Sequence, residues 1–127
     1  MCGFAGFSDT IHTREEKEAI LHRMTDRIIH RGPDMEGYHM SGEGESDSVS
    51  FGFRRLSIID LADGAQPMYN EDRTVVSVFN GEIYNYRELR SELEAKGHIF
   101  CSESDTEVIV HLYEEMGRQF VPLLNGM

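Results

Sequence analysis

The chain opens with Met1-Cys2-Gly3-Phe4-Ala5-Gly6-Phe7, and we expect the rest of the fold to be organised around this stretch. Phe4, Ala5 and Phe7, together with the small Gly3 and Gly6, predict a short buried strand. Glycines beside a reactive side chain allow a substrate or a second backbone to come close. The stretch therefore predicts a strand that carries a reactive residue at its start.

Cys2 becomes the first residue of the mature chain if Met1 is removed, which a small second side chain permits. That residue then carries a thiol and a free α-amine. The amine titrates at about 7.7–8.0 and the thiol near about 8.5, so the amine can act as the base of the thiol. Nucleophile and base would then lie on one residue, as in hydrolases that use their terminal residue. The alternative, a chance Cys2 without a catalytic role, remains open on this stretch alone.

Composition favours a single globular domain over residues 1–127, long enough to bury a sizeable core. Charged residues make up 28% and hydrophobic residues 39% of the chain, which argues against disorder. We expect no membrane association, because no apolar run approaches the roughly 20 residues that span a bilayer and no signal peptide opens the chain. The net charge of −11 argues against nucleic acid as a partner.

The cysteine and histidine patterns predict neither a disulfide framework nor a metal site. Cys2 and Cys101 are the two cysteines, and they form no CxxC pair and no Cys/His pair. The six histidines include no pair spaced four residues apart and no HExxH motif, so a structural or surface role is expected for each. We expect a cytoplasmic protein with no metal or cofactor bound to this domain.

The hydrophobic pattern predicts an α+β unit whose strands are mostly antiparallel. A first helix is expected from a capping box at Thr13-Arg14-Glu15-Glu16 to the stop signal Arg31-Gly32-Pro33-Asp34. A second capping box at Ser104-Asp105-Thr106-Glu107 predicts the start of another helix, which Gly117 ends. One more helix is expected at 85–96. Besides the opening strand, five strands are expected, at 36–40, 49–53, 56–61, 74–79 and 98–102.

Several polar residues lie next to predicted strands, where binding sites are commonly built. The guanidinium of Arg55 is a planar fork suited to a carboxylate. The side-chain amide of Asn80 and the backbone N–H of Gly81 provide the two donors that an oxyanion hole requires. Glu82 and Asp105 add negative charge suited to a substrate ammonium group.

Each of these residues also has an ordinary structural interpretation. Asn-Gly is the commonest turn dipeptide. Asp105 falls in the first turn of a predicted helix, where a carboxylate favours the helix dipole. Arg55 can be half of a surface ion pair. Taken one at a time, the residues favour these structural roles.

Together the motifs resemble the N-terminal glutaminase domain of glutamine-hydrolysing asparagine synthetase, a class II glutamine amidotransferase of the N-terminal-nucleophile hydrolase superfamily. The resemblance covers nearly the whole chain in the family's order. The matching segments are Met1-Cys2-Gly-Phe-Ala-Gly, His30-Arg-Gly-Pro-Asp34, Arg55-Leu-Ser-Ile-Ile-Asp60, Gly64-Ala-Gln-Pro-Met68, Phe79-Asn-Gly-Glu-Ile-Tyr-Asn-Tyr-Arg-Glu-Leu-Arg90 and Ser104-Asp-Thr-Glu-Val108.

The resemblance implies a role for each candidate residue in glutamine hydrolysis. Cys2 would be the nucleophile, with its own α-amine as general base. Asn80 and the Gly81 N–H would form the oxyanion hole for a glutamyl thioester pathway. The glutamine head group would be held by Arg55 at its carboxylate and by Glu82 and Asp105 at its ammonium.

The resemblance also implies a four-layer αββα sandwich, which we expect to be truncated at its C-terminus. Family members continue beyond the equivalent of Met127 with further strands and then with a synthetase domain that uses ATP and magnesium to convert aspartate to asparagine. Those sites would lie in the missing part, and L-glutamine would be the ligand of this domain. A sheet edge that lacks its neighbouring strands leaves backbone N–H and C=O groups without partners. We therefore expect two copies of the chain to associate, most simply as a symmetric homodimer.

Two other functions remain compatible with the sequence. The same glutaminase domain can serve a different ammonia acceptor, because acceptor chemistry belongs to another domain. The chain can also be a catalytically silent fragment that only binds glutamine or a partner. A glutaminase assay separates this last interpretation from the two enzymatic ones.

Overall fold

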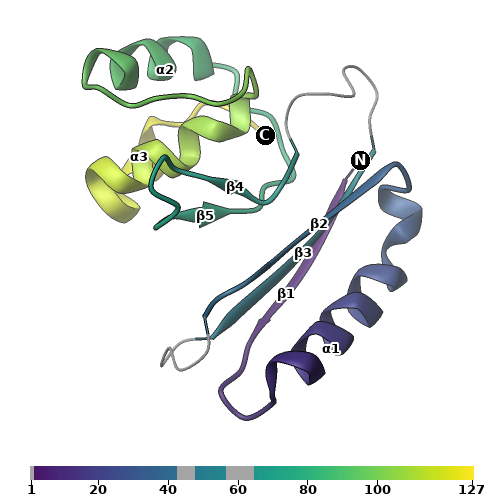
Figure 1. The fold of residues 1–127 in the computed structure, drawn as a ribbon. Helices are drawn as coiled ribbons and strands as arrows, with labels where there is room; N and C mark the ends of the chain where they lie inside the picture. Colours follow the sequence, from purple (N-terminus) through teal and green to yellow (C-terminus); the bar gives the residue numbers. More distant parts are fainter. Residues whose placement is uncertain (1, 43–47, 57–64) are drawn as a thin grey trace. The chain divides into compact units, whose positions relative to one another are not determined.

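The structure is a computed structural model that describes residues 2–42, 48–56 and 65–127. These residues fall into two compact units, one containing 2–42, 48–56 and 65–67, the other containing 68–127 (Figure 1). Both units are α+β, and every strand pairing in the described ranges is antiparallel, as predicted. The strand expected at 56–61 lies outside the described residues except for Leu56.

The first unit is built on a three-stranded sheet with the order β1-β3-β2. Its strands are β1 (Gly3–Ser8), β2 (Met35–Met40) and β3 (Val49–Arg55), which confirms the positions of the three strands predicted for this part of the chain. The predicted burial of the opening strand is wrong, because β1 lies at the edge of the sheet and Phe4 is exposed. The register places Gly3 opposite Arg54 on β3. Cys2 therefore precedes β1 at the same end of the sheet at which β3 finishes.

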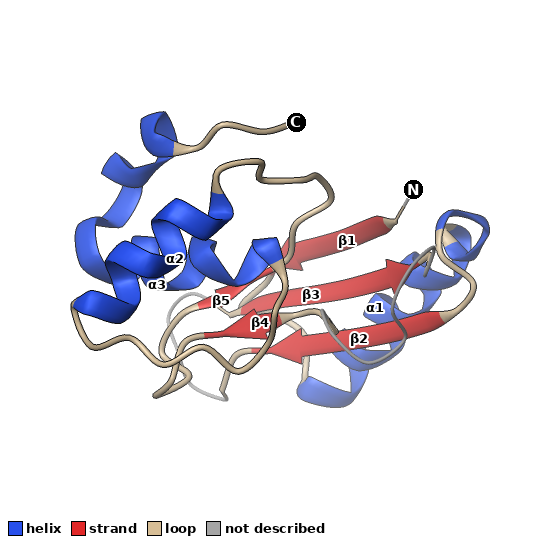
Figure 2. Cartoon of the chain, turned by 90° about the horizontal axis from the view of Figure 1, so that it is seen from above, coloured by secondary structure: helices blue, strands red, loops and turns tan. Residues whose placement is uncertain are grey.

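Helix α1 (Arg14–Arg27) covers one face of this sheet, as Figure 2 shows. The predicted capping box is present: Thr13 N donates to Glu16 Oε2 at 2.8 Å, and Glu16 N donates to Thr13 Oγ1 at 3.3 Å. The helix packs closely because Gly52 of β3 has no side chain; a Cβ there would lie 2.2 Å from Thr25 Cγ2. The helix ends at Arg27, four residues before the predicted stop, and the 3-10 helix η1 (Ile29–Arg31) follows.

Arg54 ties the helix to the sheet from a buried position. Its guanidinium forms ion pairs with Asp26 at 2.7 Å and Glu36 at 2.5 Å, and its Nε donates to the carbonyl of Thr25 at 3.3 Å. A charged group in this position is tolerated because carboxylates and a carbonyl satisfy it. Arg54 is thus structural, whereas its neighbour Arg55 is the residue singled out for substrate binding.

The second unit contains a two-stranded hairpin, β4 (Met68–Tyr69) with β5 (Val76–Ser77). The six-residue strand predicted at 74–79 is therefore wrong in length. Pro67, just before β4, has no N–H to continue the pairing. On the other strand, the N–H of Val75 donates to Asn70 Oδ1 at 2.8 Å, which ends the pairing at the turn.

The strand predicted at 98–102 is also wrong, because this segment forms no strand. Its backbone donors are bound by carboxylates instead of by a neighbouring strand. Ile99 N donates to Glu71 Oε1 at 2.6 Å, and the N–H groups of Cys101 and Ser102 donate to Glu107 at 2.7 and 2.8 Å. The second capping box is half correct: Ser104 Oγ accepts from Thr106 N, but the Glu107 carboxylate turns to residues 101–102.

Helices supply the core of the second unit. They are α2 (Tyr86–Ala95), the 3-10 helix η2 (Asp105–Glu107), α3 (Val108–Met116) and the 3-10 helix η3 (Gly117–Leu123). Gly97 and Gly117 follow α2 and α3 with φ of 105° and 57°, so both glycines act as the predicted stops. The buried apolar side chains that form the core are Ile83, Leu89, Leu93, Val108, Leu112 and Phe120.

The segment after Phe79 is held by the last residues of the chain. Glu82 N donates to Met127 O and Met127 N to Glu82 O, both at 2.9 Å, around the antiparallel bridge between Ile83 and Gly126. This pairing fixes the backbone that follows Asn80 and Gly81. None of the helices in the described ranges is long and apolar enough to cross a lipid bilayer.

Candidate functional site

Cys2 is held at the end of the first unit's sheet by hydrogen bonds to its side chain and its carbonyl. Leu56, directly after β3, donates its N–H to Cys2 Sγ at 3.4 Å. The guanidinium of Arg31 donates from Nε and Nη2 to the Cys2 carbonyl, both at 3.3 Å. The thiol is half-buried, and its position is set by both neighbouring segments. A reactant can therefore reach a sulfur that the fold has already oriented.

Arg55 lies at the same end of the sheet because it is the last residue of β3. Its carbonyl accepts from Asp34 N at 3.1 Å, and its half-buried side chain lines a small pocket with Met35, Ala65 and Gln66 among others. The antiparallel pairing of β1 with β3 thus brings Cys2 and Arg55 to the same end of the sheet, although 53 positions of sequence separate them.

Asn80, Gly81 and Glu82 form an exposed segment of the second unit. Gly81 passes so close to the end of the chain that a Cβ on it would lie 2.2 Å from the Met127 carbonyl oxygen. A side chain at this position would therefore displace the pairing between Glu82 and Met127. The glycine is required by this close approach, and the ring of Phe79 also lies against it, with Cζ 2.5 Å from where a Cβ would stand.

Asp105 reaches the same segment from the start of η2. Its Oδ2 accepts the N–H of Ile83 at 2.6 Å, and its Oδ1 contacts Thr106 Oγ1 at 3.4 Å. The carboxylate is thereby fixed next to the residue that follows Glu82. Asp105 is half-buried, whereas Glu82 is exposed.

The structure groups the six predicted residues into two sets, one in each unit. Cys2 and Arg55 belong to the first unit, and Asn80, Gly81, Glu82 and Asp105 belong to the second. Sequence reasoning missed Arg31 and Leu56 as positioning groups for Cys2. The only signal for Arg31 was its place in the motif at 30–34, and Leu56 acts through its backbone, which no residue type reveals.

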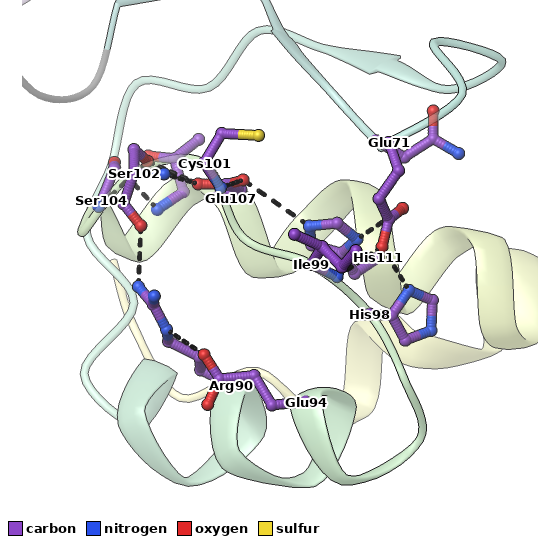
Figure 3. Close-up of polar contacts among 12 residues, drawn as sticks. Glu71, Arg90, Glu94, His98, Ile99, Cys101, Ser102, Ser104, Glu107 and His111 are labelled. Carbon is purple, nitrogen blue, oxygen red and sulfur yellow. Dashed lines mark hydrogen bonds and ion pairs between the residues drawn. The ribbon is translucent and has the colours of Figure 1, made fainter.

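Glu107, the last residue of η2 before α3, organises a buried polar cluster (Figure 3). Burial by itself would raise the pKa of Glu107, but the contact with His111 and the hydrogen bonds from Cys101 and Ser102 outweigh it and lower that pKa to about 2. The carboxylate is therefore ionised in the folded state at neutral pH. It stabilises the irregular segment at 98–102 in place of a strand partner.

Four residues of the second unit have the donor types of a metal site. One ligand atom from each of Glu71, His98, His111 and Glu114 lies within 4.8 Å of the others. The spacing of histidines in the sequence does not reveal this cluster. His111 and Glu114 are three residues apart on α3, and Glu71 and His98 come from distant segments. The His-x-x-Glu spacing on a helix is the signal that would have drawn attention to them.

Comparison with known proteins gives a consistent result over the full length of the chain. A family model described as "Glutamine amidotransferase domain" matches residues 1–127. Similar proteins include the glutamine-hydrolyzing asparagine synthetases 1 and 2 of Bacillus subtilis (strain 168), 46% and 49% identical over 129 residues, and that of Zea mays, 43% identical over 127 residues. All three matches cover 100% of this chain but only 20%, 16% and 20% of the relatives. The chain thus spans a fifth or less of the length of these curated relatives.

Proposed function

Because the chain belongs to the glutamine amidotransferase domain family, we propose that it hydrolyses the side-chain amide of L-glutamine with Cys2 as the nucleophile. The observation that carries this proposal is the register of β1 against β3, which sets Cys2 beside Arg55 and Leu56. A nucleophile and a guanidinium at the same end of the sheet suit the two ends of a glutamine molecule. The nucleophile would attack the side-chain amide, and the guanidinium would bind the α-carboxylate.

The proposed reaction starts once Met1 has been removed. The α-amine of Cys2 takes the thiol proton, and the sulfur attacks the amide carbon to form a carbon–sulfur bond. The side-chain amide of Asn80 and the N–H of Gly81 stabilise the oxyanion. The proton then passes to the leaving nitrogen, ammonia departs, and water hydrolyses the thioester to give glutamate and free thiol.

The glutamine head group is assigned to three charged side chains. Arg55 binds its α-carboxylate, and Glu82 with Asp105 bind its α-ammonium. The hydrogen bond from Ile83 to Asp105 supports this assignment, because it fixes the Asp105 carboxylate next to the residue that follows Glu82. One positive and two negative groups suit a zwitterionic amino acid better than a simple amide.

Ammonia release is assigned to asparagine synthesis, since the similar proteins of Bacillus subtilis are named glutamine-hydrolyzing asparagine synthetases. In that role the acceptor is aspartate, and ATP with magnesium would be bound by a C-terminal synthetase domain. The alternative is that the same glutaminase domain supplies ammonia to another acceptor.

We also infer the four-layer αββα sandwich, which the antiparallel sheet and packed helices of each unit support. A cytoplasmic location and a homodimer belong to the same proposal.

Retention of Met1 is expected to abolish glutaminase activity. A peptide bond to Met1 converts the Cys2 amine into an amide nitrogen, which has no basic lone pair. Intact-mass measurement on the purified protein, paired with a glutaminase assay on the same samples, checks this. Full activity in a sample that retains Met1 would rule out the amine as base, and no activity in a fully processed sample would favour a silent binding fragment.

Arg55→Ala is expected to weaken glutamine use by roughly 10- to 150-fold, the equivalent of losing one charge-assisted contact of about 1.5–3 kcal/mol. The loss should appear mainly in KM, because the head group is bound alike in the ground and transition states. Arg23→Ala, which removes an exposed arginine of α1 in the same unit, serves as the matched control. Equal glutamine kinetics in the two variants would contradict the assignment of Arg55.

A further inference from the structure

Three separate segments of the second unit bring carboxylates and imidazoles together. Glu71 lies in the turn after β4, His98 in the segment after α2, and His111 with Glu114 on α3. Residues three apart on a helix share a face, so the last two point the same way. The cluster shares no residue with the six assigned to glutamine hydrolysis.

Three separations between possible ligand atoms are close to the edges of a small coordination polyhedron, and one atom from each residue lies within 4.8 Å of the others. His98 Nδ1 lies 3.4 Å from Glu71 Oε1 and 3.8 Å from Glu114 Oε2, and His111 Nδ1 lies 3.4 Å from Glu71 Oε2. Tetrahedral zinc with bonds of about 2.0–2.1 Å has ligand–ligand edges of roughly 3.3 Å. Side-chain movements on the order of 1 Å would complete the geometry.

His111 supplies an independent observation that points to a ligand. Its side chain is fully buried, and neither ring nitrogen has a hydrogen bond within the described residues, only ion-pair contacts of 3.4 Å to Glu71 and 3.7 Å to Glu107. A buried polar group left without a hydrogen bond is costly and rare. Coordination through Nδ1 would satisfy it.

The second nitrogen of each histidine faces a carboxylate, as is usual for histidines that bind metals. His98 Nε2 lies 3.2 Å from Glu115 Oε1, and His111 Nε2 lies 3.7 Å from Glu107 Oε1. Figure 3 shows His111 between Glu71 and Glu107, with Glu107 in turn bound to Ser102. These outer carboxylates orient both rings so that Nδ1 faces the cluster.

The two carboxylates of the cluster are oriented by hydrogen bonds in the same way. The N–H of Ile99 donates to Glu71 Oε1 at 2.6 Å, and the side-chain amide of Asn70 donates to Glu114 Oε2 at 3.0 Å. An open groove lined by residues that include Lys96, Gly97, His98 and Glu115 leads to the cluster from solvent. A cation can therefore reach ligands that are already held in place.

We propose that Glu71, His98, His111 and Glu114 bind one divalent transition-metal cation of the zinc class. Two imidazoles with two carboxylates suit Zn²⁺ and its neighbours Co²⁺ and Ni²⁺, whereas Mg²⁺ and Ca²⁺ prefer oxygen ligands alone. Four protein ligands leave no open position, which is the pattern of a structural site. The cation would tie the β4–β5 turn and the segment after α2 to helix α3, and this role does not depend on glutamine hydrolysis.

The test is a Zn²⁺ titration of the purified, chelator-treated protein against a competing fluorescent zinc indicator. We expect one site that Glu114→Gln or His98→Gln weakens at least about 100-fold, more than the 10- to 100-fold typical of losing an outer partner. Glu114→Gln carries the test because the side chain of Glu114 is 38% exposed, whereas those of His98 and His111 are 9% and 0% exposed and their substitution disturbs packing more. Glu92→Gln and His22→Gln, exposed and outside the cluster, should bind Zn²⁺ like the unaltered chain.

A second readout identifies the ligands without reference to activity. Co²⁺ added to the unaltered protein should give the intense visible absorption of tetrahedral coordination, and Zn²⁺ should displace it and raise the Tm. Both signals should be lost in Glu114→Gln. Equal Zn²⁺ affinity in the unaltered chain and in the two cluster variants, or a Tm that Zn²⁺ leaves unchanged in all of them, would overturn the proposal.

Discussion

Cys2→Ala is expected to lower glutaminase activity by roughly 10⁴- to 10⁶-fold, the scale on which hydrolases lose kcat when their nucleophile is removed. The variant retains an α-amine but has no sulfur to form the thioester. The substitution removes two hydrogen bonds between Sγ and the backbone of Leu56, one from its N–H at 3.4 Å and one to its carbonyl at 3.9 Å, and leaves the strand pairing in place, so the fold of the first unit should survive. Circular dichroism and a glutaminase assay on the same sample measure both properties.

Cys101→Ala is the matched control for this experiment. Cys101 is the other cysteine of the chain, and its side chain is exposed, while its backbone N–H binds Glu107. Alanine keeps that N–H, so activity should remain unchanged. Comparable losses in both variants would contradict the assignment of Cys2, as would appreciable ammonia release by Cys2→Ala. Trapping the thioester with hydroxylamine should give a glutamyl hydroxamate from the control only.

Glu107→Gln is expected to lower the free energy of unfolding at pH 7 by up to about 3 kcal/mol. The folded-state pKa of Glu107 is depressed from 4.5 to about 2, so its ionised form stabilises the fold above pH 4.5. This contribution disappears as pH falls from 4.5 towards 2. The amide of the variant also places donors against the N–H of Ser102, which the carboxylate accepts at 2.8 Å.

Urea unfolding at pH 7 and at acid pH, with chelator present, measures the effect. The difference in unfolding free energy between the unaltered chain and Glu107→Gln should be largest at pH 7 and should shrink on acidification. Glu92→Gln removes an exposed carboxylate of α2 and should change the unfolding free energy by less than about 0.5 kcal/mol. A difference that does not vary with pH would contradict the pKa shift as its source.

Local sequence signals were enough to predict the elements whose stability is local. The capping box at Thr13 and Glu16 starts α1 as expected, because its two hydrogen bonds join residues three apart. Gly97 and Gly117 end their helices because their positive φ is easily reached only by glycine. The three strands of the first unit were also predicted, since each is long enough to show its pattern.

The errors fell where distant groups decide the backbone. β-branched residues at 74–79 favoured a long strand, but the partner strand ends after Tyr69, where Asn70 begins the turn. The segment at 98–102 has the composition of a strand, yet carboxylates of Glu71 and Glu107 bind its N–H groups. Residue type indicates how readily a segment pairs, but it does not indicate whether a partner strand is present.

The sequence by itself determined the family and the candidate residues, because the opening Cys2 and the motifs that follow occur in the family's order. Only the tertiary structure decided which candidates come together. Strand register brings Cys2 to Arg55, and one hydrogen bond brings Asp105 to Ile83 beside Glu82. The physical reason is that these contacts, like those of the Glu71–His98–His111–Glu114 cluster, join segments far apart in the chain, and their geometry is fixed only when the core between them packs.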